Sequence, residues 1–157
     1  MPKQAPRILM IGYGNPGRQD DGLGPAFIAQ FEAHASDQLH LQTNYQLTVE
    51  DAYDAQAYDQ VIFVDASIDA RLNTETPFSF EAIEATNDSG LGSHSLSPNG
   101  VIRLCETLYD KSPKAFVLGI LGYEFDQFEE RLSGQASQNL QKASIFLQNW
   151  LQSQANA

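Results

Sequence analysis

The chain has 157 residues, the length of one ordinary domain, and its 42% hydrophobic and 10% aromatic residues are typical of a folded protein. We therefore expect a single domain over residues 1–157. The formal net charge of -11 would repel a phosphate backbone, so nucleic acids are disfavoured as partners. Neutral or basic partners are favoured instead.

The amino terminus does not have the pattern of a targeting segment. Its apolar run from Ile8 to Ile11 is too short for a signal peptide and is broken at Gly12. No later segment reaches membrane-spanning length. Cys105 is the only cysteine, so no intrachain disulfide can form, which suits a reducing compartment. These observations predict a cytoplasmic protein without a membrane partner.

The amino-terminal part of the chain predicts a strand, a glycine-rich turn and a helix. The dense apolar run over 7–13 is typical of a buried parallel strand, and it stops at Gly12. Apolar residues at helical spacing predict a helix over 20–35. Pro25 is compatible with that helix if it lies in the first turn, where its missing N–H has no intrahelical acceptor.

The middle of the chain predicts strands of different kinds. A strand of mixed polarity over 39–47 is followed by an acidic, helical connection over 49–58. The run QVIFVD over 60–65 is apolar up to its final carboxylate, which indicates a buried strand near the centre of the sheet. The stretch over 77–85 alternates apolar and polar residues, which is typical of a strand at or near an edge. Its inward residues would be Phe78, Phe80 and Ala82.

The carboxyl-terminal part predicts two helices around another buried strand. Ser97 is a good helix N-cap with Pro98 at the first helical position. A buried strand over 115–121 follows, and Ser133 begins a last helix. The apolar face of the first of these helices would consist of Val101, Leu104, Cys105 and Leu108, and that of the last helix of Ala136, Leu140, Ala143, Leu147 and Trp150.

Alternating strands and helices predict the fold class. We expect an α/β protein with three layers, α/β/α, in which helices cover both faces of a mostly parallel, twisted central sheet with right-handed crossovers. Ligands of such sheets bind outside the carboxyl ends of the strands. Three polar features fall there: the turn GYGNPGRQDDGLG over 12–24, Asp65, and His94 in the loop before a helix.

The glycine-rich turn has two interpretations. Its glycines follow a strand and precede a helix, as in a dinucleotide-binding loop, but Asp20 and Asp21 would repel a pyrophosphate at the helix start. One of these carboxylates could instead cap the helix, and both could be stabilised by the helix dipole, an effect worth up to about 1 kcal/mol at the surface. Capping explains one acid better than two, and the helix terminus would hold a carboxylate ionised, as a metal ligand must be.

Asp65 and His94 are the other candidates. Asp65 ends a central apolar strand, where it would either bind a ligand or accept hydrogen bonds from the next turn, and Asp69 is a weaker rival further into the loop. His94 stands between small serines, so its ring has room to reach a ligand. His34 and His40 are expected to be structural or merely exposed.

Other catalytic layouts fit less well. No GxSxG nucleophile elbow is present, and Cys105 falls on an apolar helix face, where an inert core thiol is expected. The acidic residues Asp126, Glu129 and Glu130 are interpreted as a solvated loop, although they could line the same edge. Two carboxylates and an imidazole, Asp21, Asp65 and His94, remain as a plausible three-ligand site for a divalent cation, with nickel favoured over manganese or iron by affinity order.

At these residues the chain resembles the hydrogenase maturation protease family, peptidases that trim the C-terminal tail of the large subunit of nickel-iron hydrogenases. The matching pieces run nearly end to end: GYGNPGRQDDGLG, VIFVDA, SHSLSP and LGILGYEFD with the closing helix. The resemblance implies a phosphorylase/hydrolase-like fold and an aspartate-containing endopeptidase site. Matched by motif position, its metal-contacting and catalytic residues are Asp21, Asp65 and His94. Family members carry either Glu or Asp at the first of these positions, so Asp21 is compatible with the pattern.

The resemblance further implies that the nickel arrives with the large-subunit precursor, and that no organic cofactor is needed. The precursor is the expected partner, and a monomer is the expected state. The metal would fix the scissile bond in place and would either polarise its carbonyl or activate a water molecule for hydrolysis. Alternatively, a carboxylate would act as the general base. Two rivals stay open, namely a nucleotide-binding α/β module and a non-catalytic assembly chaperone.

Overall fold

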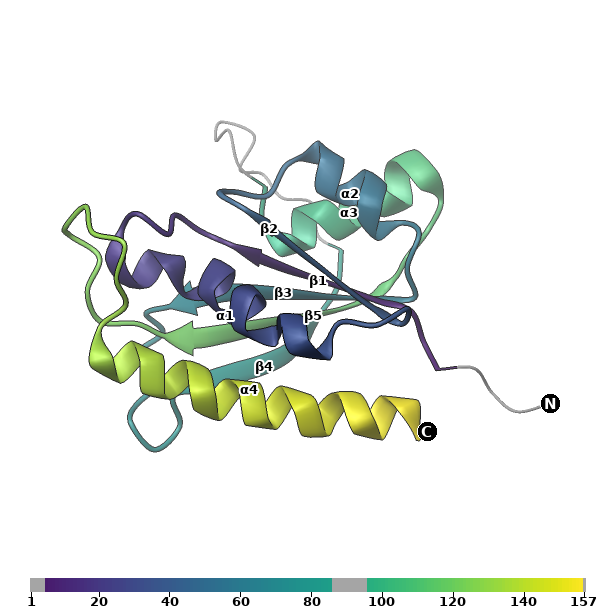
Figure 1. The fold of residues 1–157 in the computed structure, drawn as a ribbon. Helices are drawn as coiled ribbons and strands as arrows, with labels where there is room; N and C mark the ends of the chain where they lie inside the picture. The colour runs from purple at the N-terminus through teal and green to yellow at the C-terminus, as the bar shows by residue number, and fades with distance from the viewer. Residues whose placement is uncertain (1–4, 86–95, 157) are drawn as a thin grey trace.

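In a computed structural model, which describes residues 5–85 and 96–156, five strands form one sheet in the order β2-β1-β3-β5-β4 (Figure 1). The neighbouring strands β2, β1, β3 and β5 are parallel, and β4 pairs antiparallel with β5 at the edge. The strands are β1 (Ile8–Tyr13), β2 (Leu39–Asn44), β3 (Gln60–Ser67), β4 (Phe78–Ile83) and β5 (Lys114–Leu121).

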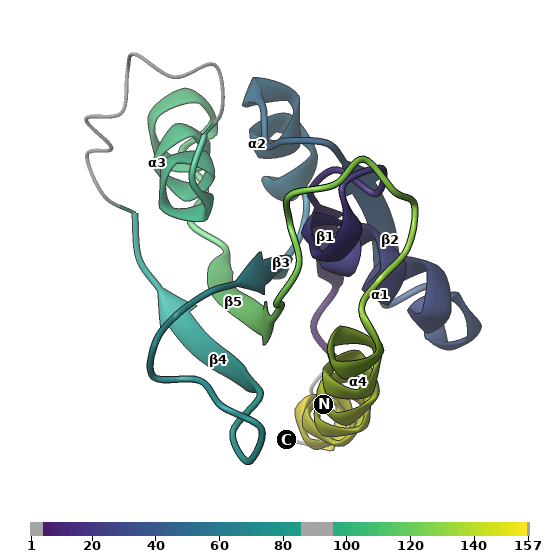
Figure 2. The same cartoon turned by 90° about the vertical axis from the view of Figure 1, so that its left-hand side faces the viewer.

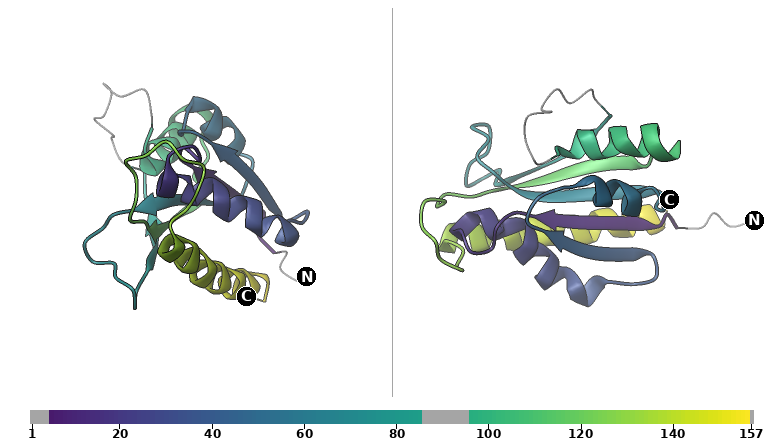
Figure 3. Two further views of the ribbon diagram at one scale, coloured as in Figure 1. Left: turned by 60° about the vertical axis from the view of Figure 1, so that its left-hand side comes forward. Right: turned by 90° about the horizontal axis from the view of Figure 1, so that it is seen from above.

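Helices cover both faces of this sheet (Figures 1 and 3). The α-helices α1 and α4 lie on one face, and α2 and α3 pack together on the other. Two short 3-10 segments, η1 and η2, flank α1. The helical segments are η1 (Gln19–Gly22), α1 (Leu23–Phe31), η2 (Glu32–His34), α2 (Val49–Ala55), α3 (Pro98–Tyr109) and α4 (Gly134–Ala155). The predicted three-layer α/β/α arrangement with a mostly parallel sheet is therefore confirmed.

Each face of the sheet has its own apolar core because side chains alternate between the two faces along every strand. Met10, Ile62 and Leu118 pack with α1 and α4, whereas Ile11 and Phe63 pack with α2 and α3. Strands β1, β3 and β5 are buried on both sides, as their continuous apolar runs predict. They bring their carboxyl ends to one edge of the sheet, which Figure 2 shows face on.

The predicted helix starts are largely confirmed. The Ser97 hydroxyl accepts a hydrogen bond from Gly100 N at 3.0 Å, and the Ser133 hydroxyl accepts one from Ala136 N at 3.2 Å. Pro25 lies in the first turn of α1, as expected. Two predicted core residues are wrong. Leu108 is 57% exposed, and Ile102 points into the core in its place. Ala82 is exposed on the edge strand β4, whereas Phe78 and Phe80 pack against the core as expected.

The predicted helix over 20–35 is shorter than expected at both ends. Asp20 and Asp21 belong to the 3-10 segment η1, and α1 itself runs only from Leu23 to Phe31 before η2 begins. Within the described ranges, no helix is both long enough and apolar enough to cross a membrane.

Candidate functional site

Asp21 and Asp65 come together at the carboxyl edge of the sheet from different elements. Asp65 lies in β3, between β1 and β5, and Asp21 lies in η1 just after β1. Both side chains are half-buried. Burial raises the pKa of the Asp65 carboxyl to about 6, and the nearby charge of Asp21 pushes it in the same direction. The two carboxylates therefore share one partly dehydrated site, as the sequence predicted from the strand ends.

The turn after β1 holds Asp21 in place. Its Oδ2 accepts a hydrogen bond from Asn15 N at 2.9 Å, which closes the turn across six residues. Gly14, which directly precedes Asn15, has a φ of +135°, and a Cβ there would collide with the Asp21 carbonyl oxygen. Glycine is therefore required at this position of the turn.

Tyr13 is a neighbour of Asp65 that the sequence interpretation missed. It ends β1, and its hydroxyl hydrogen-bonds to the Asp65 carboxyl, opposing part of the effect of burial there. Burial and the adjacent Asp65 charge in turn raise the pKa of the Tyr13 hydroxyl, so it stays a protonated donor. The available signal was its position: Tyr13 ends the strand next to the one that carries Asp65.

Asp20 corrects the capping interpretation of the acidic pair. It caps neither η1 nor α1, both of which begin without a side-chain cap. Its buried carboxylate instead accepts hydrogen bonds from Tyr123 N at 2.8 Å, Glu124 N at 3.0 Å and both Ser133 donors, at 2.7 and 2.8 Å. Burial alone would raise the pKa of Asp20, but these hydrogen bonds outweigh it and lower the pKa. Asp20 thus ties the turn to the loop between β5 and α4.

The weaker candidates lie outside this site. Asp69 forms an ion pair with the exposed Arg71 at 2.6 Å, which lowers the pKa of Asp69 to about 2. Cys105 is buried on α3 and donates to Ala52 O at 3.4 Å, and burial raises the pKa of its thiol to about 11. It is therefore the inert core thiol that was expected. The acidic residues Asp126, Glu129 and Glu130 are exposed in the β5–α4 loop.

The predicted third ligand, His94, lies outside the described residues. Within residues 5–85 and 96–156, no group of three or more His, Cys, Asp or Glu side chains is placed to hold a metal ion. The Asp21–Asp65 pair supplies only oxygen donors. Two adjacent carboxylates that repel one another favour a cation between them.

Of the other histidines, the structure gives each a local partner. His40 Nδ1 lies 2.6 Å from the Tyr58 hydroxyl, and the His34 ring contacts the Phe31 ring at a centroid distance of 4.8 Å. Both residues are remote from Asp65, at the end of the sheet where the strands begin. Their expected structural character fits these contacts.

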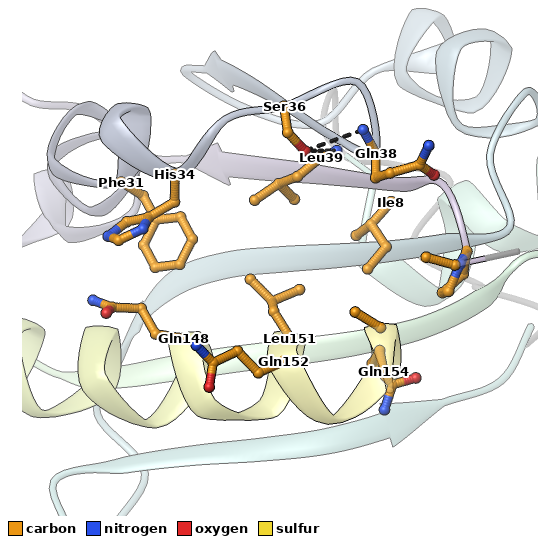
Figure 4. Close-up of a pocket in the computed structure, with 13 residues that line it drawn as sticks. Ile8, Phe31, His34, Ser36, Gln38, Leu39, Gln148, Leu151, Gln152 and Gln154 are labelled. Carbon is orange, nitrogen blue, oxygen red and sulfur yellow. Dashed lines mark hydrogen bonds between the residues drawn. The ribbon is translucent and has the colours of Figure 1, made fainter. Parts of the chain in front are cut away.

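Two cavities differ in their relation to the carboxylate pair. One of about 310 Å³ lies beside the Asp21 turn and is lined by Gly14, Pro16, Pro25, Thr43, Asn44 and Tyr45. Another of about 390 Å³ lies at the opposite edge, between the end of α4 and the start of β1 (Figure 4). Phe31, Leu39 and Leu151 line it with several glutamine side chains, and it holds none of the predicted site residues.

The fold and the carboxylate pair define the class of protein: a three-layer α/β/α protein with an acidic site at the carboxyl edge of its sheet. No protein-family model matches the chain, and no curated protein matches it. Solved structures do. The hydrogenase maturating endopeptidase HybD from E. coli is similar with a TM-score of 0.72 and 17% identity, over 94% of this chain and 93% of that chain.

Two further structures agree. The [NiFe] hydrogenase maturation protease HycI from Thermococcus kodakarensis KOD1 is similar with a TM-score of 0.71 and 17% identity, over 93% of this chain and 92% of that chain. A hydrogenase 2 maturation peptidase from a Thaumarchaeota archaeon is similar with a TM-score of 0.64 and 19% identity, over 92% of this chain and 97% of that chain. The chain therefore has the fold of the hydrogenase maturation endopeptidases, as the sequence resemblance implied.

Proposed function

We propose that this chain is an endopeptidase that removes the C-terminal extension from the nickel-loaded large-subunit precursor of a [NiFe] hydrogenase. The observation that carries the proposal is the Asp21–Asp65 pair at the carboxyl edge of a sheet whose fold is that of hydrogenase maturation endopeptidases. Fold alone does not define activity, so the proposal depends on this site. We assign residues 1–157 to one protease domain that works as a monomer in the cytoplasm.

The nickel in this proposal belongs to the substrate. Asp21 and Asp65 supply two anionic oxygens, and we assign His94 as the third contact. Three ligands leave coordination positions for groups of the precursor. A metal that is already bound to the precursor would bring the scissile bond to a fixed place at this edge, which lowers the entropic part of the barrier.

Hydrolysis can then follow either of two routes. In the first, the nickel polarises the scissile carbonyl or activates a water molecule. In the second, Asp65 takes a proton from water, the hydroxide adds to the carbonyl carbon, and the C–N bond breaks as the amine gains a proton. A pKa of about 6 suits Asp65 to this task, because a general base works best near the operating pH.

A nucleotide-binding module is the first rival. The phosphates of a nucleotide would meet the Asp21 carboxylate, which already accepts a hydrogen bond from Asn15 N in the turn after β1. The Asp20 carboxylate, bonded to Tyr123 N and Ser133 N, adds a second negative charge beside that turn. Both features oppose an anionic ligand. The second rival is a non-catalytic chaperone, which would keep the same contacts to the precursor without cutting it.

The test is incubation with a precursor that carries nickel and with the same precursor without it, followed by intact-mass measurement. We expect loss of a C-terminal peptide from the nickel-loaded form alone. An unchanged mass together with stable binding would favour the chaperone. Tight stoichiometric binding of NAD or FAD in equilibrium dialysis would favour the nucleotide module.

A further inference from the structure

Three exposed apolar side chains follow strands at the edge of the sheet that carries the carboxylate pair. Among the described residues, the most exposed large hydrophobic side chains are Tyr45 at 72%, Ile68 at 78% and Phe128 at 86%. Tyr45 directly follows β2, Ile68 directly follows β3, and Phe128 lies in the loop that connects β5 to α4. A large apolar side chain that is exposed beside a site is a candidate contact for another protein, and Phe128 is the most exposed of the three.

The loop that carries Phe128 is held firmly to the turn after β1. Gln19 N donates to Glu129 O at 2.9 Å, and Gln127 N donates to Gln19 Oε1 at 2.9 Å. Both chain neighbours of Phe128 are therefore bonded to a single residue. In Figure 2 this loop arches beside the start of α1, which follows the same turn.

Gln19 makes these contacts in an unfavourable backbone conformation. Its φ is +50°, a region that non-glycine residues rarely adopt and that costs of the order of 1 kcal/mol. The side chain is nevertheless buried, at 7% exposure. The strained conformation of Gln19 is therefore retained in a contact that fixes the loop carrying the solvent-exposed ring of Phe128.

A ring held in this way is suited to binding. Aromatic residues are the usual energetic anchors of protein interfaces, and a loop that is already ordered loses little entropy when a partner covers it. Phe128 has no ring partner among the described aromatic pairs. The side chain would gain its burial from the partner.

Charge defines the chemistry of that partner. Around Phe128 the loop exposes the acidic side chains of Glu124, Asp126, Glu129 and Glu130, and its single cation, Arg131, pairs with Glu129 at 3.3 Å. A nucleic acid or an anionic membrane would be repelled. A second copy of the chain, with a net charge of -11, would be repelled as well.

We propose that Phe128 and its acidic neighbours form a docking surface for a folded protein that offers an apolar pocket rimmed by Lys and Arg. Resting on the proposed function, we identify this partner as the folded body of the large-subunit precursor. Phe128 binds that body, whereas Asp21 and Asp65 act on the nickel and on the tail. The ring contributes to affinity and leaves the chemical step unchanged.

The test is the dissociation constant for the nickel-loaded precursor, measured by surface plasmon resonance. Every protein carries Asp65→Asn, so that the precursor is not consumed. We expect Phe128→Ala to weaken binding at least about tenfold and Phe128→Leu to weaken it less. The control Ile145→Ala removes a side chain that is 62% exposed on α4, and its affinity should equal that of the parent. Thermal unfolding verifies that each variant is folded.

Equal affinity of the Phe128→Ala variant and the parent would overturn the docking surface. Cleavage by the wild type is measured separately, so either proposal can fail while the other stands. A second comparison tests the acidic residues around Phe128. The double variant Asp126→Asn, Glu130→Gln should associate more slowly and with a weaker salt dependence than the charge-matched control Glu32→Gln, Asp37→Asn. Identical association rates for the two double variants would contradict a role of the acidic neighbours of Phe128 in docking.

Discussion

The Asp20 carboxylate accepts two hydrogen bonds from Ser133, one from its backbone N at 2.7 Å and one from its hydroxyl at 2.8 Å. Ser133 is itself the N-cap of α4. The acid therefore joins the turn after β1 to the first turn of the last helix, 113 residues away. Asp21, one residue further on, is positioned by that anchored turn.

Asp20→Asn should destabilise the protein by about 3 kcal/mol or more. The amide keeps only one acceptor oxygen, and its NH₂ group would face backbone N–H donors in a fully buried place. Urea unfolding measures the loss. Asp37→Asn, at an exposed position, is the control and should change stability by less than about 0.5 kcal/mol.

Lowering the pH should remove the contribution that the ionised Asp20 carboxylate makes to the stability of the folded protein. Its pKa is lower in the folded protein than in the unfolded chain, so the folded state gains stability from the ionised group at neutral pH. That gain is complete above the unfolded pKa of about 4 and is lost as the pH falls through the lower folded value. The stability difference between the wild type and Asp20→Asn should therefore shrink below about pH 4. A difference that stays constant down to pH 2 would contradict the assignment.

Asp65→Asn should have the opposite effect on stability. The folded pKa of about 6 lies above the unfolded value, so the folded state binds the proton more tightly and loses stability as the pH rises from about 4 to 6. The neutral amide avoids this loss. We expect the free energy of unfolding of Asp65→Asn to exceed that of the wild type by about 1–3 kcal/mol at pH 7, and this difference should disappear near pH 4. Thermal unfolding of both proteins between pH 4 and pH 7 measures it. Equal stability of the two proteins at pH 7 would argue against a carboxylate whose ionised form is disfavoured by burial and by Asp21.

Gly24→Ala separates helix propensity from packing. Propensity alone predicts a stabilisation of about 1 kcal/mol, because alanine is the better helix former. A Cβ at Gly24 would, however, collide with the carbonyl oxygens of Tyr13 and Val64, which bring α1 directly onto β1 and β3. We expect a net loss of about 1–3 kcal/mol. In the control Gly134→Ala, the new Cβ meets no atom within 4 Å, so stability should hold or rise.

Cys105 should be dispensable for cleavage. Its raised pKa of about 11 and its buried position keep the thiol protonated and shielded. Iodoacetamide at pH 7.5 should label the native protein slowly and the unfolded protein fully. The Cys105→Ala variant should process the precursor within about twofold of the wild-type rate. Loss of processing in a folded Cys105→Ala variant would instead indicate thiol chemistry.

Most of the fold could be predicted because local patterns encode it. The continuous apolar runs of β1, β3 and β5 gave central parallel strands, and the caps Ser97 and Ser133 gave the helix starts. Leu108 was misplaced because its position on α3 satisfies the apolar spacing, whereas tertiary packing turns Ile102 inward instead. Spacing alone does not separate two neighbouring stripes of a short helix.

The site was predictable only in part. Asp21 and Asp65 could be placed at one edge because parallel strands end together there. The separate role of Asp20 could not be predicted, since its partners Tyr123, Glu124 and Ser133 are more than 100 residues away. Local sequence carries no signal for such contacts. The assignment of His94 remains a prediction because that residue lies outside the described part of the chain.

The most direct test of the carboxylate pair compares two aspartates at the end of the same strand. Asp65 belongs to the pair, whereas Asp69 is held by Arg71 in an exposed ion pair. The measurement is the rate at which each folded variant releases the C-terminal peptide from a nickel-loaded precursor. We predict that Asp65→Asn slows release at least about 100-fold and that Asp69→Asn stays within about twofold of the wild type. Release at the wild-type rate by folded Asp65→Asn would contradict the account.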